Sequence, residues 1–152
     1  LDAAVLLDAI SHVTGVPEEY ISGKQGFPSG TRAITLLPGT PSSFMKLFER
    51  NERKALPEGK PEPALSQALH ILTGKTFNEK IAKQGGWLDQ ILQSGATNKE
   101  IIEELYLRSL SRFPSRGELM KLQGLVQKRP RKEALKSLTW AIISSRQFSH
   151  NN

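Results

Sequence analysis

The chain has 152 residues, of which 38% are hydrophobic and 24% charged, with no Cys and a net charge of +6. This length predicts a single domain that buries about two thirds of its unfolded surface and needs no disulfide or structural metal. The composition excludes a disordered chain, thiol catalysis and Cys-ligated metal sites, and no apolar run approaches the roughly 20 residues of a membrane span.

The N-terminal part predicts one helix followed by a long loop. Apolar side chains at helical spacing predict a helix over residues 2–14, which Gly15 ends. The high Gly and Pro content of residues 16–42 predicts a long arm, packed over the helices by its apolar side chains. Within it we expect a first helical turn at Glu18–Glu19 and a short extended piece at residues 32–37.

The rest of the chain reads as a series of helices. Two capping boxes, Thr97 with Glu100 and Ser115 with Glu118, mark two of the helix starts. In the helix that follows Ser115 we expect Leu119, Leu122, Leu125 and Val126 to face inward. The predicted helices span residues 43–50, 63–73, 78–83, 86–93, 98–111, 115–128 and 131–147. The fold class is therefore an all-α bundle of seven or eight helices, with residues 1–152 as one domain.

The start of the chain bears on its origin. It begins with Leu1 rather than Met and enters an amphipathic segment without a basic and then apolar leader. We expect a domain excised from a longer protein, whose compartment cannot be read from its own N-terminus.

No set of residues assembles into a recognisable catalytic or metal site. His12, His70 and His150 do not pair at metal-ligand spacing. The adjacent Glu103 and Glu104 do not share a helix face, and Glu104 is placed to pair with Arg108 instead. We therefore predict no catalytic residues, no metal, no cofactor and no enzyme activity.

The positive charge is concentrated near the C-terminus. Residues 127–152 hold six Lys or Arg and one Glu, whereas residues 1–30 hold one Lys and four carboxylates. Such a cluster either binds a polyanion or is a solvated helix face, and the second reading is the commoner. The candidate residues for polyanion or partner binding are Lys128, Arg129, Arg131, Lys132 and Lys136, joined in the polyanion reading by Arg50, Arg53 and Lys54.

Several separate stretches carry a family resemblance. They are residues 1–17 (LDAAVLLDAISHVTGVP), 62–74 (EPALSQALHILTG), 103–119 (EELYLRSLSRFPSRGEL) and 138–148 (LTWAIISSRQF). In this order the chain resembles the C-terminal domain of unknown function of large planctomycete-type proteins, often with cytochrome-c-like modules upstream. The resemblance implies an exported or envelope-associated bacterial protein. A more distant similarity links Leu110–Pro114 to the Leu-x-Arg-x-Pro helical hairpin of phycobilisome linkers and bacterial surface repeats, which are binding modules.

The chain also departs from that family pattern. The family commonly has a Cys-acidic-Cys segment where this chain has residues 51–60 without Cys, so no redox or metal role carries over. The family's closing Asn and Glu are replaced here within Trp140–Phe148 by Ser and Gln.

Three functions remain open from the sequence. The first is a non-catalytic domain that packs on the upstream domains of its own polypeptide or on an envelope protein. The second is a polyanion-binding module for nucleic acid or acidic polysaccharide, with nucleic acid the less expected partner. The third is an accessory domain of an upstream enzyme.

Overall fold

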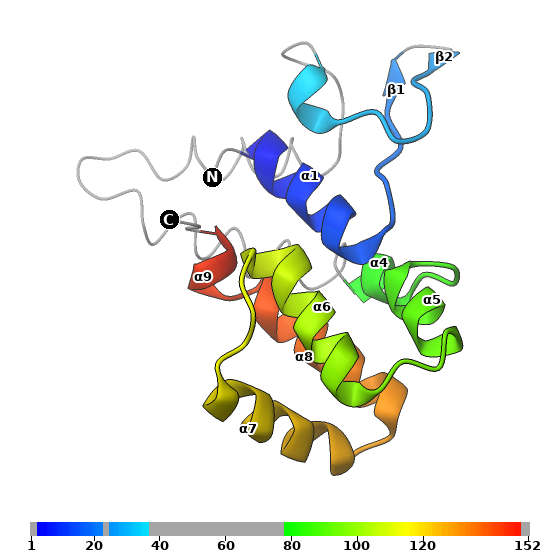
Figure 1. The fold of residues 1–152 in the computed structure, drawn as a ribbon. Helices are drawn as coiled ribbons and strands as arrows, with labels where there is room; N and C mark the ends of the chain where they lie inside the picture. Colours follow the sequence, from blue (N-terminus) through cyan, green and yellow to red (C-terminus); the bar gives the residue numbers. More distant parts are fainter. Residues whose placement is uncertain (1–2, 23–24, 37–77, 150–152) are drawn as a thin grey trace, which may run out of the picture.

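The computed structural model describes residues 3–22, 25–36 and 78–149, which form a mainly helical fold (Figure 1). The all-α class is confirmed for these residues, apart from one antiparallel pair of two-residue strands. The elements in chain order are α1 (Ala3–Thr14), β1 (Ile21–Ser22), β2 (Gln25–Gly26), the 3-10 helix η1 (Ala33–Thr35), α4 (Asn78–Ala82), α5 (Trp87–Gln93), α6 (Asn98–Leu110), α7 (Arg116–Gln127), α8 (Arg131–Ile143) and α9 (Arg146–Ser149).

The core lies between α1, α6 and α8. Figure 1 shows α6 and α8 in the middle of the molecule, with α1 on one side and α7 on the other. Each of the three core helices presents an apolar stripe, and burying one Leu or Ile side chain contributes roughly 1.5–3 kcal/mol. The most deeply buried apolar side chains are Leu6, Leu7, Ile10 and Val13 of α1, Ile101, Ile102 and Leu105 of α6, and Leu135 and Ile143 of α8.

The end of α1 packs tightly against the start of α5. Gly15 follows the helix with φ +65°, a left-handed conformation that glycine adopts without steric cost. A Cβ at this position would lie 3.0 Å from the backbone nitrogen of Trp87. The predicted end of the first helix is therefore confirmed, and the same glycine permits close contact with α5.

The segment after α1 differs from the prediction. No helical turn forms at Glu18–Glu19, and residues 32–36, the described part of the piece expected at 32–37, do not form a strand. Glu18 instead lies 2.8 Å from the Lys80 amine, which also donates to the Val16 carbonyl at 3.0 Å. These contacts hold the segment in an irregular path beside α4.

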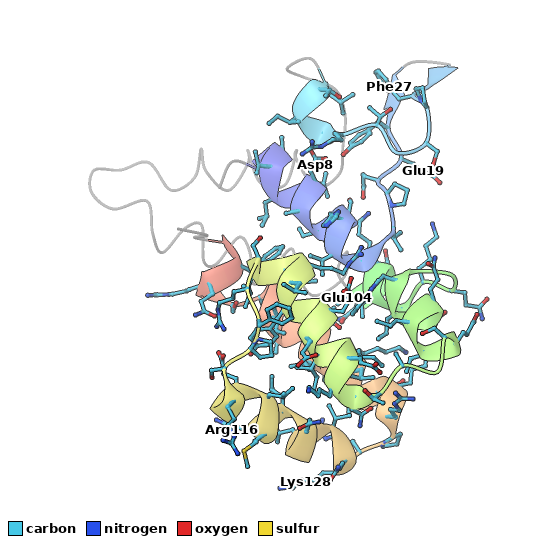
Figure 2. The ribbon with its side chains drawn as sticks, viewed as in Figure 1. Asp8, Glu19, Phe27, Glu104, Arg116 and Lys128 are labelled. Atoms are coloured by element: carbon cyan, nitrogen blue, oxygen red, sulfur yellow. The ribbon has the colours of Figure 1, made fainter. Side chains whose placement is uncertain are left out.

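The 3-10 helix η1 replaces the expected extended piece because a distant carboxylate caps it. The Asp8 side chain accepts hydrogen bonds from the backbone amides of Ala33 at 2.6 Å and Ile34 at 3.2 Å. Figure 2 shows Asp8 on α1 facing this turn. The packing expected of the arm's apolar side chains is only partly observed, since Tyr20 is buried while Phe27 and Ile34 are exposed.

The two capping boxes place the starts of α6 and α7 as predicted. The Thr97 hydroxyl accepts from the Glu100 amide and the Glu100 carboxylate accepts from the Thr97 amide, and Ser115 and Glu118 repeat the arrangement. Between them α6 ends at Leu110, and the residue that follows, Ser111, has φ 55°. The chain thereby turns sharply, and α7 leaves the axis of α6.

The predicted last helix is two helices. It breaks at Ser144–Ser145, between α8 and α9. The Ser145 hydroxyl donates to the Ile142 carbonyl at 2.6 Å and accepts from the Phe148 amide at 3.3 Å, in competition with the regular helix bonds. The bend turns Phe148 into the core, where it is 3% exposed.

Some sequence predictions lie outside the described residues. These are the helices at 43–50 and 63–73, which contribute to the expected total of seven or eight, and the last part of the arm, 37–42. Among the residues that the structure describes, no helix is long and apolar enough to cross a membrane.

Candidate functional site: the outer face of α7

Three of the five predicted basic residues that the structure describes are engaged in contacts within the chain. The Lys132 amine lies 2.6 Å from the Asp89 carboxylate and lowers the pKa of that carboxyl. Arg131 donates to the Asn98 side chain at 2.7 Å and to the Ala96 carbonyl. These pairs join the start of α8 to the α5–α6 region and so hold the fold together.

Of the other candidates that the structure describes, one is in an ion pair and two are not. Lys136 pairs with Glu133 one turn away on α8, at 3.1 Å. Lys128 and Arg129, in the turn after α7, are exposed and make no ion pair with any described residue. Arg50, Arg53 and Lys54 lie outside the described residues. Of the five predicted residues from Lys128 to Lys136, therefore, only Lys128 and Arg129 have charges that no described residue binds.

A groove of about 620 Å³ runs along α1 and carries charged side chains from three segments. Its charges are already matched: Asp8 holds η1 and lies 3.6 Å from Arg32, while Glu18 is bound to Lys80. Arg108, also in its lining, donates to the His12 carbonyl and stacks on Trp87 at 5.4 Å. These groups stabilise the chain's own turns, and neither Trp87 nor Trp140 lines the groove.

The described residues contain no group of three or more His, Cys, Asp or Glu able to hold a metal ion. His12 is exposed on α1, and His70 and His150 lie outside the described residues. Glu104 lies 3.9 Å from Arg108, as the sequence predicts, and Glu103 lies 3.8 Å from Lys99. Both carboxylates are thus partners of cations on their own helix.

The outer face of α7 has no partner in the described structure. Leu119 and Leu122 are half-buried and Val126 is buried, so one narrow stripe of the helix packs on the core. The expectation that Leu125 faces inward is wrong, since this side chain is 50% exposed. Met120 on α7 is 66% exposed and Phe113 in the preceding turn is 61% exposed.

Four cations lie beside these exposed apolar side chains: Arg116, Lys121, Lys128 and Arg129. All four are exposed, and none makes an ion pair with a described residue. Figure 2 shows Arg116 and Lys128 at the two ends of α7, on the outer edge of the molecule. We call the surface formed by Phe113, Arg116, Gly117, Met120, Lys121, Gly124, Leu125, Lys128 and Arg129 the α7 outer face.

Arg112 and Glu118 fix the direction in which this face points. The Arg112 guanidinium donates two hydrogen bonds of 2.9 Å to the two carboxylate oxygens of Glu118. It also donates to the Gln147 side chain at 3.3 Å and lies over the Tyr106 ring at 5.2 Å. Glu118 in turn accepts from the Ser115 amide, so one carboxylate both caps α7 and ties it to α6 and α9.

The same contacts explain the acidity of Glu118. The Arg112 guanidinium, and after it the Ser115 backbone amide, lowers the pKa of Glu118 to about 2. The sequence places Arg112 at a helix end, where it is expected to bond the last carbonyls of that helix. In the structure it bonds Glu118, Gln147 and the Phe113 carbonyl instead.

The exposed apolar side chains of α7 were not predicted from the sequence. The spacing of its apolar residues is compatible with a wide buried stripe that includes Leu125, whereas the stripe that packs on the core in the structure is narrower and leaves Leu125 exposed. The sequence feature that could have indicated this exposed face is a pair of glycines, Gly117 and Gly124, on the side of the helix away from the packed leucines. Glycine within an exposed helix weakens it, so two of them on one face indicate a requirement other than helix stability.

No protein-family model, curated protein or solved structure matches this chain.

Proposed function

We propose that this chain is a non-catalytic interaction domain that docks a protein partner on the α7 outer face. The observation that carries the proposal is the exposure of Phe113, Met120 and Leu125 on one side of the molecule, beside cations that make no ion pair with a described residue. Met, aromatic residues and Arg are enriched in protein interfaces, where their burial contributes to binding. The partner is an upstream domain of the same polypeptide or an envelope protein.

The rigid mounting of α7 supports the same proposal. A docking surface binds more tightly when its geometry is fixed before the partner arrives, because less ordering is needed on binding. The contacts of Glu118 with Arg112 and Ser115 supply such a mounting at the start of α7.

Polyanion binding is the second candidate, and one observation favours it: Lys128 and Arg129 are adjacent, exposed and unpaired within the described residues. Arg131, Lys132 and Lys136 are engaged with neighbouring groups, which reduces the charge available to phosphates. The exposed apolar side chains beside these cations fit a protein better than a nucleic acid. An accessory role beside an upstream enzyme is compatible with the same docking surface.

The proposal extends to the rest of the molecule as the sequence predicts it. The complete fold is a single domain of seven or eight helices with an arm near residues 16–42. The family resemblance supports a parent protein of the planctomycete-type group, at the cell envelope or outside the cell.

Photo-crosslinking in native cells tests the docking function. A photoreactive phenylalanine analogue replaces Met120 in the full-length protein, since this apolar side chain of the face is 66% exposed. We expect an adduct with an envelope protein or with an upstream segment of the same polypeptide, and loss of that adduct when Leu125→Glu is added.

The same analogue at Gln84, which is exposed between α4 and α5, serves as the control. Adducts of equal yield at Gln84 and Met120, or none at Met120, contradict a docking role for α7. Adducts with nucleic acid or polysaccharide alone favour the second candidate instead.

A further inference from the structure

We infer that the α7 outer face binds an acidic amphipathic helix, an inference that rests on the proposed docking role of α7 and names the chemistry of its partner. Three features carry it: the arrangement of apolar side chains on the face, its charge, and the two glycines along its centre.

The centre of the face is a line of alternating glycines and lysines. Gly117, Lys121, Gly124 and Lys128 follow one another at spacings of four, three and four residues, which places them along one side of the helix. A Cβ atom added at Gly117 or Gly124 would meet no atom within 4 Å. The glycines therefore leave two open notches in the surface, with a cation after each.

Apolar side chains flank this line on both sides. Met120 lies one turn from both Gly117 and Gly124, and Leu125 lies one turn from both Lys121 and Lys128. Both are at least half exposed. A second helix laid along the line would cover both flanks, and the notches would let its backbone approach closely.

The positive charge of the α7 outer face favours a partner with negative charge. Residues 113–129 contain four exposed cations and a single carboxylate, Glu118, which is occupied by Arg112. No described residue offers a counter-charge to Lys121 or Lys128. A partner helix with carboxylates along the edges of its apolar stripe supplies that counter-charge, in the way that charged edges set pairing in coiled coils.

The same features disfavour two other anionic partners. An interfacial membrane helix has one continuous apolar face, whereas Met120 and Leu125 lie on opposite sides of a cationic line. A nucleic acid gains little from exposed Met and Leu, and the single exposed aromatic residue of the face, Phe113, is not interleaved with a run of cations.

Fluorescence anisotropy with labelled probes tests the inference on the purified chain. The main probe is a synthetic heptad-patterned helix with Leu at the a and d positions and Glu at the e and g positions. The comparison probes are the same peptide with Gln for Glu, the same residues in scrambled order, a DNA duplex, and vesicles containing anionic lipid. We expect the Glu helix to bind at least about tenfold more tightly than each of the others, with an affinity that falls as salt rises.

Variants of the face identify where the probe binds. Lys121→Glu with Lys128→Glu is expected to weaken binding of the Glu helix about tenfold or more, and the milder Gln pair to weaken it less. Gly124→Gln is expected to weaken binding as well, because its side chain fills a notch. Lys83→Glu, at an exposed cation away from α7, is the matched control and retains wild-type affinity. Circular dichroism of each variant establishes that it is folded.

Several results would overturn the inference. They are equal binding of the Gln helix or the scrambled peptide, tighter binding of DNA or vesicles, no binding of the Glu helix, or unchanged affinity in the lysine pair or in Gly124→Gln. The docking function is judged separately by the Met120 adduct. If Met120 still forms the adduct but the crosslinked segment of the partner is not acidic, the docking function is supported and the inference of an acidic partner is wrong.

Discussion

Glu118 is the residue on which most local contacts converge. Its two oxygens accept from Arg112 and from the Ser115 amide, both in the turn between α6 and α7. Because these contacts stabilise the ionised form, the pKa of Glu118 falls from its ordinary 4.5 to about 2. A carboxyl whose pKa is lower in the folded state stabilises the protein at pH values above its unfolded pKa.

We therefore expect Glu118→Gln to lower the free energy of unfolding by about 1 kcal/mol at pH 7, a value limited by solvent screening at this partly exposed site. The difference between wild type and variant should shrink as the pH falls from about 5 towards 2, because the unfolded state then binds a proton that the folded state resists. Urea unfolding at several pH values measures both quantities. A difference that stays constant or grows over that range contradicts the assignment.

At the scale of the element, the starts of α6 and α7 were predictable because their determinants are local. Thr97 and Ser115 each cap a helix whose third residue is Glu, so four consecutive residues contain the whole signal. The turn at η1 was not predictable in this way. Its cap is Asp8, which lies 25 residues before Ala33 and meets it only after α1 and the following segment have folded.

The break between α8 and α9 and the exposure of Leu125 were likewise not predictable from the local sequence. Apolar spacing continues past Ser144–Ser145 to Phe148, so this spacing does not mark the bend at which Ser145 bonds the Ile142 carbonyl and the Phe148 amide and Phe148 is buried. Likewise, the spacing of apolar residues on α7 does not specify how wide a stripe the core will cover. Of the candidate site, the cations Lys128 and Arg129 were predicted, whereas the apolar part of the face was not.

The two classes of glycine in this chain predict opposite effects of substitution. Gly124→Ala is expected to raise the free energy of unfolding by up to about 1 kcal/mol, because alanine favours the helix and its Cβ meets nothing. Gly15→Ala is expected to lower it, because φ is +65° there and the Cβ would lie 3.0 Å from the Trp87 nitrogen. Thermal unfolding of the two variants measures this contrast, and a stabilising Gly15→Ala or a destabilising Gly124→Ala contradicts it.

At the scale of the whole molecule, the first and last parts of the chain form one core. Buried side chains of α1 lie in the same apolar cluster as those of α6 and α8, although up to about 140 residues separate them along the chain. The predicted single domain requires that these helices unfold together.

Leu7→Ala tests that requirement, because this side chain is 0% exposed in α1. We expect a loss of about 3 kcal/mol in the free energy of unfolding, the usual cost of such a cavity. The experiment uses a Trp87→Phe background, because the chain has two tryptophans and only Trp140 lies in α8. Trp140 fluorescence and far-UV circular dichroism should then shift to a lower denaturant midpoint by the same amount, since α8 and α1 share a core. If the Trp140 transition stays at its midpoint in the Trp87→Phe parent, the two parts of the chain unfold independently.

The contacts of Arg112 constrain how this sequence is able to vary over evolutionary time. Replacing Arg112 alone leaves the Glu118 carboxylate with fewer donors, and replacing Glu118 alone removes both the helix cap and the partner of a cation that also contacts Gln147. The two positions are therefore coupled, so the cost of replacing both differs from the sum of the two single costs. Substitutions at positions 112, 115 and 118 should therefore be linked. The identities of these three residues should co-vary among descendants of this chain.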